Sequence, residues 1–283
     1  YLCGELLSLF SIEDTGKNVK SGKKDLSHAA PYAIMAVNLS VKMRRKAVMI
    51  SGRGSLCRMT FEELPKEMQN PETRAWQEKL HARWAALAGK RVFDVAASLL
   101  ILLVTSPFFL LLALAIKLDS RGPVFYRQVR VGRYNQDFRI FKFRTMVQNA
   151  DKIGLSLTVG DDPRITRVGR FIRKCRLDEF SQLLNVLSGS MSLVGPRPEV
   201  RRYVDAYTPE YMATLLVRPG ITAPSSIAFK DEDKLLENSS DPEKTYIEEV
   251  LPPKMKLNLE YLEHISVWGD IKILFQTVAA VLR

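Results

Sequence analysis

The chain has 283 residues, 46% of them hydrophobic, and a formal net charge of +11. This length and apolar content suit one sizeable domain plus a membrane element, and the charge suits phosphate-bearing partners such as nucleotides, anionic lipids or nucleic acid. The three histidines are too few and too dispersed for a histidine-based metal site. The three scattered cysteines form no zinc-binding spacing and indicate reduced thiols facing the cytoplasm (Cys3, Cys57 and Cys175).

Two segments precede the first long apolar run. Residues 1–58 carry basic clusters and show no sustained period, so we expect either a disordered basic arm or a leader foreign to the native protein. Residues 59–89 form an amphipathic segment, and a helix is predicted over residues 71–88. Such a helix could lie at a membrane interface or pack on the soluble domain, and both interpretations stay open. The helix is predicted from one apolar stripe (Trp76, Leu80, Trp84 and Leu87).

Residues 95–116 are a long, uncharged apolar run. About 20 apolar residues cross the hydrocarbon core of a bilayer, so this length is that of a membrane helix. Because Lys and Arg near a membrane segment prefer the cytoplasmic side, we expect both ends of the run on that face. Basic residues stand at both ends: Lys90 and Arg91 before the run, Lys117 and Arg121 after it.

The pair Ser106-Pro107 lies near the middle of the run. Pro107 cannot donate a hydrogen bond to the carbonyl of Leu103, and its ring crowds that turn. We therefore predict a re-entrant helix–break–helix over residues 90–120, with Ser106 and Pro107 at the break. Each arm would have about 12–15 residues, or roughly 20 Å, which reaches through one leaflet.

Residues 121–283 are predicted to form one domain of the α/β class, mostly helical with a small β-hairpin or sheet. Two short strands are expected at 124–126 and 138–143, around a turn with Gly and Asn. A stripe with helical spacing covers residues 180–187. We further expect helices at 201–216 and 270–282, an extended stretch at 193–198 and, in part, a surface loop at 230–253.

Asp178 and Glu179 are adjacent acids at the head of the 180–187 helix. Their ordinary explanation is a favourable interaction with the helix macrodipole. Their context suits a multiply charged anionic ligand instead, because many basic residues stand just upstream (Arg164, Arg167, Arg170, Arg173, Lys174 and Arg176).

The basic residues around Asp178 and Glu179 favour phosphoryl chemistry at these acids. A carboxylate among such cations would be held ionised, and an ionised Asp beside bound phosphates can attack phosphorus to form an acyl phosphate. A divalent cation would be needed to offset the repulsion between that carboxylate and the phosphates.

Three further features stand out, and the first two each allow two interpretations. Gln182 and Asn185 share a helix face with Asp178, and that face either belongs to a site or is solvated. Arg197 lies between two prolines and is either a rigid phosphate clamp or an exposed turn residue. The basic cluster at residues 127–144 could bind lipid head groups.

Several stretches together resemble the monotopic phosphoglycosyl transferases, also called bacterial sugar transferases. They are KRVFDVAASLL with the internal Ser106-Pro107, GPVFYRQVRVGRYNQDFRIFKFRTM, DPRITRVGRFIRKCRLDEFSQLLNVLSGSMSLVGPRPE, RPGIT and DIKILFQT. The resemblance runs from about residue 90 to the C-terminus. It implies that the chain transfers a sugar-1-phosphate from a UDP-sugar to a polyprenyl phosphate such as undecaprenyl phosphate, with release of UMP. That reaction is the first membrane step of surface polysaccharide or glycoconjugate assembly.

The resemblance also implies residue roles. Residues 121–283 would be the catalytic domain, Asp178 the covalent nucleophile, and Glu179 a residue that positions Mg²⁺ or activates the lipid phosphate. Both acids are therefore candidate metal ligands. The substrate phosphates are expected to bind basic side chains (Arg173, Arg176, Arg197, Lys142, Arg144 and Lys230).

One stretch differs from the family pattern. Many members follow PGIT with Gly-Trp-Ala-Gln-Val-Asn-Gly-Arg, whereas residues 223–230 read APSSIAFK. Lys230 stands where that arginine would be, and it keeps the charge but loses the bidentate fork. The difference concerns recognition of the sugar rather than the phosphoryl chemistry.

The family resemblance implies a setting on the cytoplasmic face of a bacterial inner membrane, with a monotopic anchor. The expected partners are the UDP-sugar, the polyprenyl phosphate and membrane lipids, without nucleic acid, and a homodimer stays open. Two rival classes also stay open. A non-enzymatic basic membrane protein that binds anionic lipid or nucleic acid would not explain the Asp178-Glu179 pair. A membrane phosphatase would release free sugar phosphate.

Overall fold

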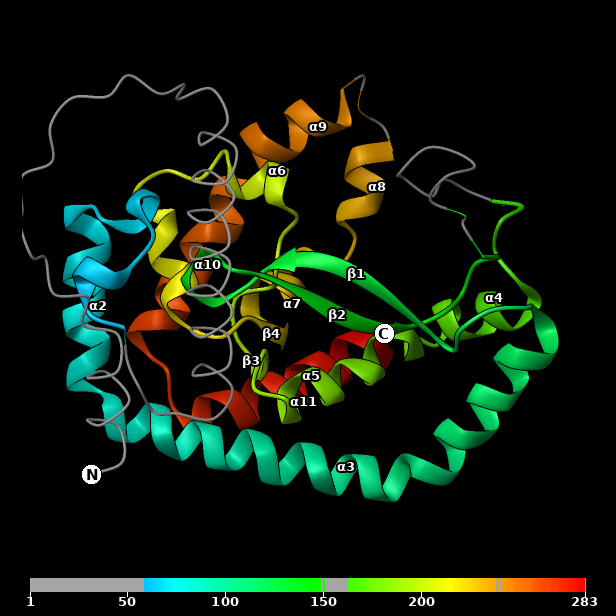
Figure 1. Ribbon diagram of the computed structural model, residues 1–283. Coiled ribbons are helices and arrows are strands. Elements are labelled where there is room, and N and C mark those ends of the chain that lie inside the picture. Colours follow the sequence, from blue (N-terminus) through cyan, green and yellow to red (C-terminus); the bar gives the residue numbers. More distant parts are fainter. Residues whose placement is uncertain (1–58, 149, 151–161, 238, 240, 283) are drawn as a thin grey trace, which may run out of the picture. The chain divides into compact units, whose positions relative to one another are not determined.

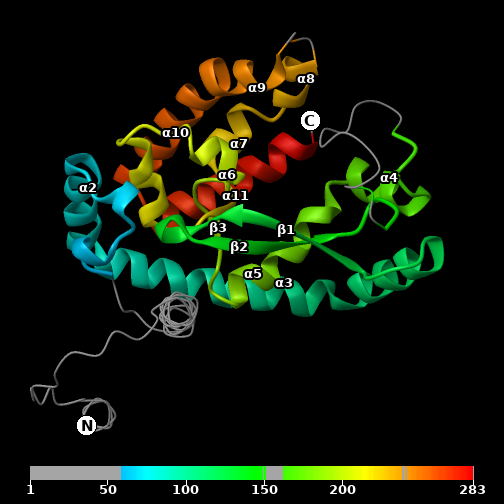
Figure 2. The same ribbon diagram turned by 45° about the horizontal axis from the view of Figure 1, so that its top comes forward.

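The computed structural model describes residues 59–148, 150, 162–237, 239 and 241–282, which all belong to the unit Arg53–Arg283. This part of the chain is mostly helical and carries two small sheets (Figures 1 and 2). The prediction of a mostly helical fold with a small sheet is therefore confirmed. The predictions for residues 1–58 fall outside the described residues.

The amphipathic segment forms η2 (Phe61–Glu63), η3 (Lys66–Met68) and α2 (Pro71–Ala82). The Asn70 side chain caps α2 by accepting a hydrogen bond from the Thr73 N–H at 2.7 Å. The helix predicted over residues 71–88 is interrupted at Arg83, whose backbone leaves the helical conformation (φ −101°, ψ 23°). The next helix begins at the following residue.

The apolar stripe of this segment faces the domain. Leu80 is buried, and Trp76 and Leu87 pack against the same core, whereas Trp84 is 57% exposed. The structure thus favours packing of α2 on the domain over an interfacial position, and it leaves the Trp84 side chain facing outward.

The membrane segment is one continuous helix, α3 (Trp84–Asp119), with Pro107 inside it. The helix bends in its C-terminal part (Figures 1 and 2). Pro107 supplies no N–H to the carbonyl of Leu103, and the Ser106 hydroxyl donates to that carbonyl instead, at 2.9 Å. The expected interruption of the helix at Ser106-Pro107 is therefore absent from the described chain.

Among the described residues, α3 is the one helix long and apolar enough to cross a membrane, with a mean hydropathy of 2.8. Only 11% of its most apolar window is buried, whereas the core helix of a soluble protein would be mostly covered. This exposed apolar helix indicates a membrane-bound protein. Its large exposed side chains are Val92, Leu99, Leu100, Leu103, Val104, Phe108, Leu110, Leu111, Leu114 and Leu118.

The N-terminal end of α3 is fixed to the domain by buried polar contacts. Lys90 forms ion pairs with Asp94, at 3.6 Å, and with Asp270. Asp94 also accepts hydrogen bonds from the Ser192 hydroxyl (2.6 Å) and the Leu193 N–H (3.2 Å). Lys90 thus lies at the start of the membrane helix, as expected, but its side chain points into the protein.

The C-terminal end of α3 is fixed to the same domain. Arg144 donates hydrogen bonds to the carbonyls of Ile116 (3.3 Å) and Ser120 (2.6 Å), which stabilises the free carbonyls of a helix end. Asp119 accepts a hydrogen bond from the Val168 N–H at 2.8 Å. Both ends of the apolar helix are therefore attached to one folded body.

The strands form two small sheets. β1 (Phe125–Val131) and β2 (Asp137–Phe143) make an antiparallel hairpin, joined by η4 (Arg133–Asn135). The hairpin confirms the predicted strand pair, although β1 extends beyond the predicted 124–126. β3 (Ser192–Val194) pairs in parallel with β4 (Gly220–Thr222). β3 overlaps the stretch 193–198, which the sequence predicts to be extended.

The helices after the hairpin are short. The helix predicted over 201–216 is split, because Pro209 lies between its two parts and disfavours a helical residue before it. The segment expected partly as loop at 230–253 is largely helical. The elements are α4 (Arg167–Lys174), η6 (Leu177–Gln182), α5 (Leu183–Leu187), α6 (Arg201–Val204), η7 (Tyr211–Leu216), α7 (Pro224–Ala228), α8 (Glu232–Glu237), α9 (Pro242–Thr245), the π-helical η8 (Tyr246–Val250), α10 (Leu251–Glu263) and α11 (Val267–Leu282).

The close packing of α4 on the chain after β2 gives a test of the fold. A Cβ atom on Gly169 would lie 2.0 Å from the carbonyl oxygen of Thr145, so Gly169→Ala should lower the free energy of unfolding by roughly 1–3 kcal/mol. Thermal unfolding in detergent measures this. The matched control is Gly89→Ala, where a Cβ meets nothing within 4 Å and the helix should gain up to about 1 kcal/mol. Equal stability of the two variants would contradict the packing.

Candidate active site

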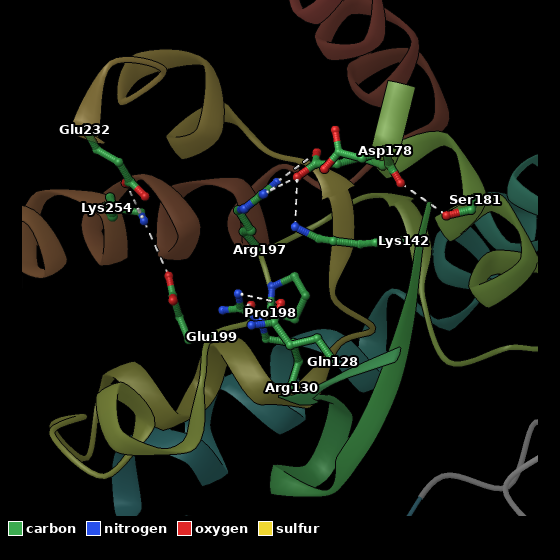
Figure 3. Close-up of polar contacts among 11 residues, drawn as sticks. Gln128, Arg130, Lys142, Asp178, Ser181, Arg197, Pro198, Glu199, Glu232 and Lys254 are labelled. Atoms are coloured by element: carbon green, nitrogen blue, oxygen red, sulfur yellow. Dashed lines mark hydrogen bonds and ion pairs between the residues drawn. The ribbon is translucent and has the colours of Figure 1, made fainter. Parts of the chain in front are cut away.

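The Asp178-Glu179 pair lies on the 3₁₀ turn η6, which is fastened to β2. The Ser181 hydroxyl donates to the Phe141 carbonyl at 2.9 Å, and Asn185 accepts from the Phe141 N–H at 2.8 Å. Asn185 is 2% exposed, so it is a structural residue and neither of its two proposed roles applies. These contacts hold the two acids beside the strand that carries Lys142 (Figure 3).

Glu179 is held by two cations. Arg197 donates hydrogen bonds to both of its carboxylate oxygens, one of them at 3.3 Å, and the Lys142 ammonium lies 3.8 Å away. Burial alone would raise the pKa of Glu179, but Arg197, Lys142 and Arg176 outweigh burial and hold it at about 2. Glu179 in turn raises the pKa of Arg197. This rigid, paired Arg197 fits the clamp interpretation better than the exposed-turn interpretation.

Asp178 has a different environment. Its carboxylate makes no hydrogen bond or ion pair with another residue in the part of the chain that the structure describes. Burial raises the pKa of Asp178 and Glu179 raises it further, which outweighs Lys142 and Arg173. The expectation that cations depress the pKa of the reacting carboxylate is therefore wrong for Asp178, because burial, together with the charge of Glu179, raises its pKa by more than Lys142 and Arg173 lower it.

The structure brings together four of the six predicted phosphate-binding side chains. Lys142 and Arg197 contact Glu179. Arg176 precedes the two acids and has the left-handed backbone conformation (φ 50°). Arg173 lies close enough to lower the pKa of Asp178 by its charge. Arg144 is instead buried at the end of α3. Lys230 is exposed, and no contact joins it to the acids within the described residues.

Arg130 is a site residue that the sequence analysis did not single out. It lies on the same face of the hairpin as Lys142, since Tyr126 pairs with Lys142 and residues two apart share a face. Its guanidinium reaches the Pro198 carbonyl at 3.5 Å and Gln128 at 3.1 Å (Figure 3). Strand alternation could have found it.

A buried charge network adjoins Arg197 (Figure 3). Lys254, 3% exposed, contacts Glu199 at 3.3 Å and Glu232 at 2.9 Å, and the Tyr246 hydroxyl donates to Glu199 at 2.6 Å. These residues are far apart in sequence, and of the four only Glu199 lies in a stretch that carries the family resemblance. The network holds the segment after Arg197 against α8 and α10.

Aromatic contacts connect the pair of acids to the membrane helix. The ring of Phe180, the residue after Glu179, lies 6.2 Å from that of Phe109 on α3, and Phe109 lies 5.5 Å from Phe143. Phe180 is 41% exposed. The Phe180 side chain thus connects the turn that carries the two acids to the apolar helix.

The acidic groups can be tested for a fit to Mg²⁺. No group of three or more His, Cys, Asp and Glu side chains gathers in the described part of the chain. Mg²⁺ does not need such a cage, because it commonly binds one or two carboxylates together with substrate phosphates and waters. The unpaired carboxylate of Asp178 beside Glu179 fits that kind of site.

The Glu179 environment predicts a pH-dependent stability. The pKa of about 2 in the folded protein lies below the ordinary 4.5, so the contribution of Glu179 is present above about pH 4.5 and is lost as the pH falls towards 2. In thermal unfolding, the stability difference between wild type and Glu179→Gln should be constant above about pH 5 and shrink below it. The exposed Glu67→Gln serves as control. Parallel profiles for all three proteins would contradict the assignment.

Comparison with known proteins shows the family of this chain. The family model described as bacterial sugar transferase matches residues 85–283. The chain is 40% identical over 196 residues to the UDP-N-acetylgalactosamine-undecaprenyl-phosphate N-acetylgalactosaminephosphotransferase of Aeromonas hydrophila, covering 68% of this chain and 43% of that protein. It is 40% identical to the UDP-glucose:undecaprenyl-phosphate glucose-1-phosphate transferase of Escherichia coli K12, covering 67% and 39%.

A third relative is shorter. The exopolysaccharide production protein PSS of Rhizobium leguminosarum is 38% identical, and the match covers 68% of this chain and 94% of that protein. The chain thus spans less than half of the first two relatives and nearly all of the third. The family match begins at residue 85, at the start of α3, and includes every residue around Glu179 and Asp178. The chain belongs to the bacterial sugar transferase family.

Proposed function

We propose that the protein transfers a sugar-1-phosphate from a UDP-sugar to a polyprenyl phosphate, with UMP and a polyprenyl diphosphate sugar as products. Relatives of this chain are named as undecaprenyl-phosphate sugar phosphotransferases. The observation that carries the proposal is the unequal pair of acids: Glu179 is paired with Arg197 and Lys142, while the carboxylate of Asp178 is left without a partner among the described residues.

The unequal environments suggest separate roles. A carboxylate oxygen of Asp178 would attack the sugar-bearing phosphorus, and the bond from that phosphorus to the oxygen of UMP would break, which leaves the phosphosugar on Asp178 as an acyl phosphate. A phosphate oxygen of the polyprenyl phosphate would then attack the same phosphorus and release Asp178. Arg197 and Lys142, positioned by Glu179, would stabilise the charge on the phosphoryl oxygens.

We assign a candidate Mg²⁺ site to Asp178 and Glu179. Bound there with the substrate phosphates, the cation would offset the repulsion between a carboxylate and the incoming diphosphate. Burial raises the pKa of Asp178, and a cation bound beside it would favour its ionised form.

The proposed setting is the cytoplasmic face of a bacterial inner membrane, with α3 re-entering on the face from which it came. Support comes from the attachment of both helix ends to one folded body and from the apolar side chains exposed between them. The contact of Phe180 with Phe109 would hold the nucleophile near the level of a lipid phosphate. A lipid-linked acceptor needs an active site at that height.

The test of the proposal is Asp178→Asn. Because the amide cannot serve as nucleophile, UMP release from UDP-sugars in the presence of undecaprenyl phosphate should fall by about three orders of magnitude or more, with membrane binding intact. The control Asp205→Asn changes an exposed acid with no role in the site and should keep full activity. Unchanged activity in Asp178→Asn would refute the assignment of the nucleophile.

Trapping separates this mechanism from its rivals. A UDP-sugar labelled in the sugar phosphate should label wild type at Asp178 without acceptor, and the label should move to lipid when undecaprenyl phosphate is added. Release of free labelled sugar phosphate into water would instead identify a phosphatase. UMP formation that requires both substrates, with no trapped adduct, would contradict the covalent step.

A further inference from the structure

A cavity whose lining includes several basic side chains lies apart from Asp178 and Glu179. It has a volume of about 70 Å³ and lies between α2, the N-terminal end of α3, the turn η4 and the stretch before β4. The helix α2 and the start of α3 are at the left of Figure 1. None of Asp178, Glu179 and Arg197 lines it. Three arginines from distant parts of the chain do, namely Arg91, Arg133 and Arg218.

Arg218 has unused hydrogen-bond donors. Its Nε donates to the Gly189 carbonyl at 2.9 Å, but its two Nη groups make no hydrogen bond with any described residue. Arg91 donates to the carbonyls of Val186 (2.8 Å) and Met191 (3.4 Å). Burial lowers the pKa of Arg218, and the charge of Arg91 lowers it further, against a weaker opposite effect of Tyr134 and Asp94. The two guanidinium groups therefore repel each other in a partly dehydrated space.

The acids near this cavity are already engaged. Asp94 lines it, but its oxygens accept from Ser192 and the Leu193 N–H and face Lys90. Asp270 pairs with Lys90 and accepts from Tyr261 at 2.8 Å. Within the described part of the chain, neither Arg91 nor Arg218 is hydrogen-bonded to a carboxylate, and the charge of Asp94 acts on both only from a distance.

The turn that supplies the third arginine is strained. Tyr134 and Asn135 have φ values of 60° and 57°, and a bulky residue such as Tyr seldom adopts this left-handed conformation, which is costly. The turn holds Arg133 over the Tyr134 ring, 4.3 Å from its centroid, with its Nε on the Leu216 carbonyl at 3.0 Å. Such strain is often kept where a ligand is bound.

We propose that this cavity binds a phosphate group, held by Arg218 and Arg91 with Arg133 at its edge. Planar guanidinium groups match the oxygens of a phosphate in geometry and in charge. The volume is several times the roughly 10–15 Å³ that a single water needs, so a tetrahedral oxyanion has room. The phosphate could be free in solution or belong to the head group of a phospholipid, since the cavity lies beside the first turns of the membrane helix.

The test measures binding of labelled inorganic phosphate to the detergent-purified full chain at constant ionic strength. Arg218→Gln should weaken one binding event by about tenfold or more, because it removes a charge-assisted pair of hydrogen bonds. Arg197→Gln, at the candidate active site, should retain that event, as should the exposed control Arg121→Gln. Arg218→Lys, which keeps the charge without the fork, should give an intermediate affinity.

Loss of the event in Arg197→Gln but not in Arg218→Gln would overturn the proposal, as would equal binding by all variants. Thermal unfolding without phosphate checks that Arg218→Gln is folded, and Arg218→Lys decides the case if it is not. A lipid arm identifies the source. Vesicles of phosphatidylglycerol, but not of phosphatidylcholine, should displace the labelled phosphate if anionic lipid occupies the cavity, and neither should displace it if the ligand is free phosphate.

Discussion

The buried ion pairs of Lys90 determine how the membrane helix and the catalytic domain are joined. An ammonium buried with Asp94 and Asp270 is stable only while its partners stay in place, because an unpaired buried charge is very costly. It links the start of α3 to α11, which lies far away in the sequence. At the other end Arg144 and Asp119 attach α3 to the chain around β2 and α4. The apolar middle of the helix is therefore exposed between two fixed ends.

The packing of the domain on α3 also determines where Asp178 and Glu179 lie. The Phe180–Phe109 contact places η6 against α3, and the hydrogen bonds of Ser181 and Asn185 hold η6 on β2. Glu179 forms ion pairs with Arg197 and Lys142, whereas the carboxylate of Asp178 has no partner among the described residues. Two neighbouring carboxylates thus have opposite pKa shifts, and this difference in environment is the basis for proposing Glu179 as the positioning acid and Asp178 as the nucleophile.

Features that depend on local pattern could be predicted from the sequence. Two short strand-forming runs around a turn predicted the hairpin, and the apolar run with Pro107 predicted a membrane helix broken at Ser106-Pro107, where the structure has one continuous helix. The break did not follow, because the neighbouring Ser106 hydroxyl compensates the missing N–H. Lys90 was expected only as a basic residue at the cytoplasmic end of the membrane run, whereas its side chain is buried and pairs with Asp270, 180 residues away. The Glu199–Lys254 contact likewise joins residues that no local pattern relates.

The central claim is that both ends of α3 lie on one side of the bilayer. The most direct measurement is labelling by a membrane-impermeant maleimide of single cysteines at Gly89 and Arg121, both exposed, in a chain with Cys3, Cys57 and Cys175 replaced by Ser. In intact cells neither site should react, and in inside-out vesicles both should. Reaction of one site from outside and the other from inside would show a straight crossing and contradict the account.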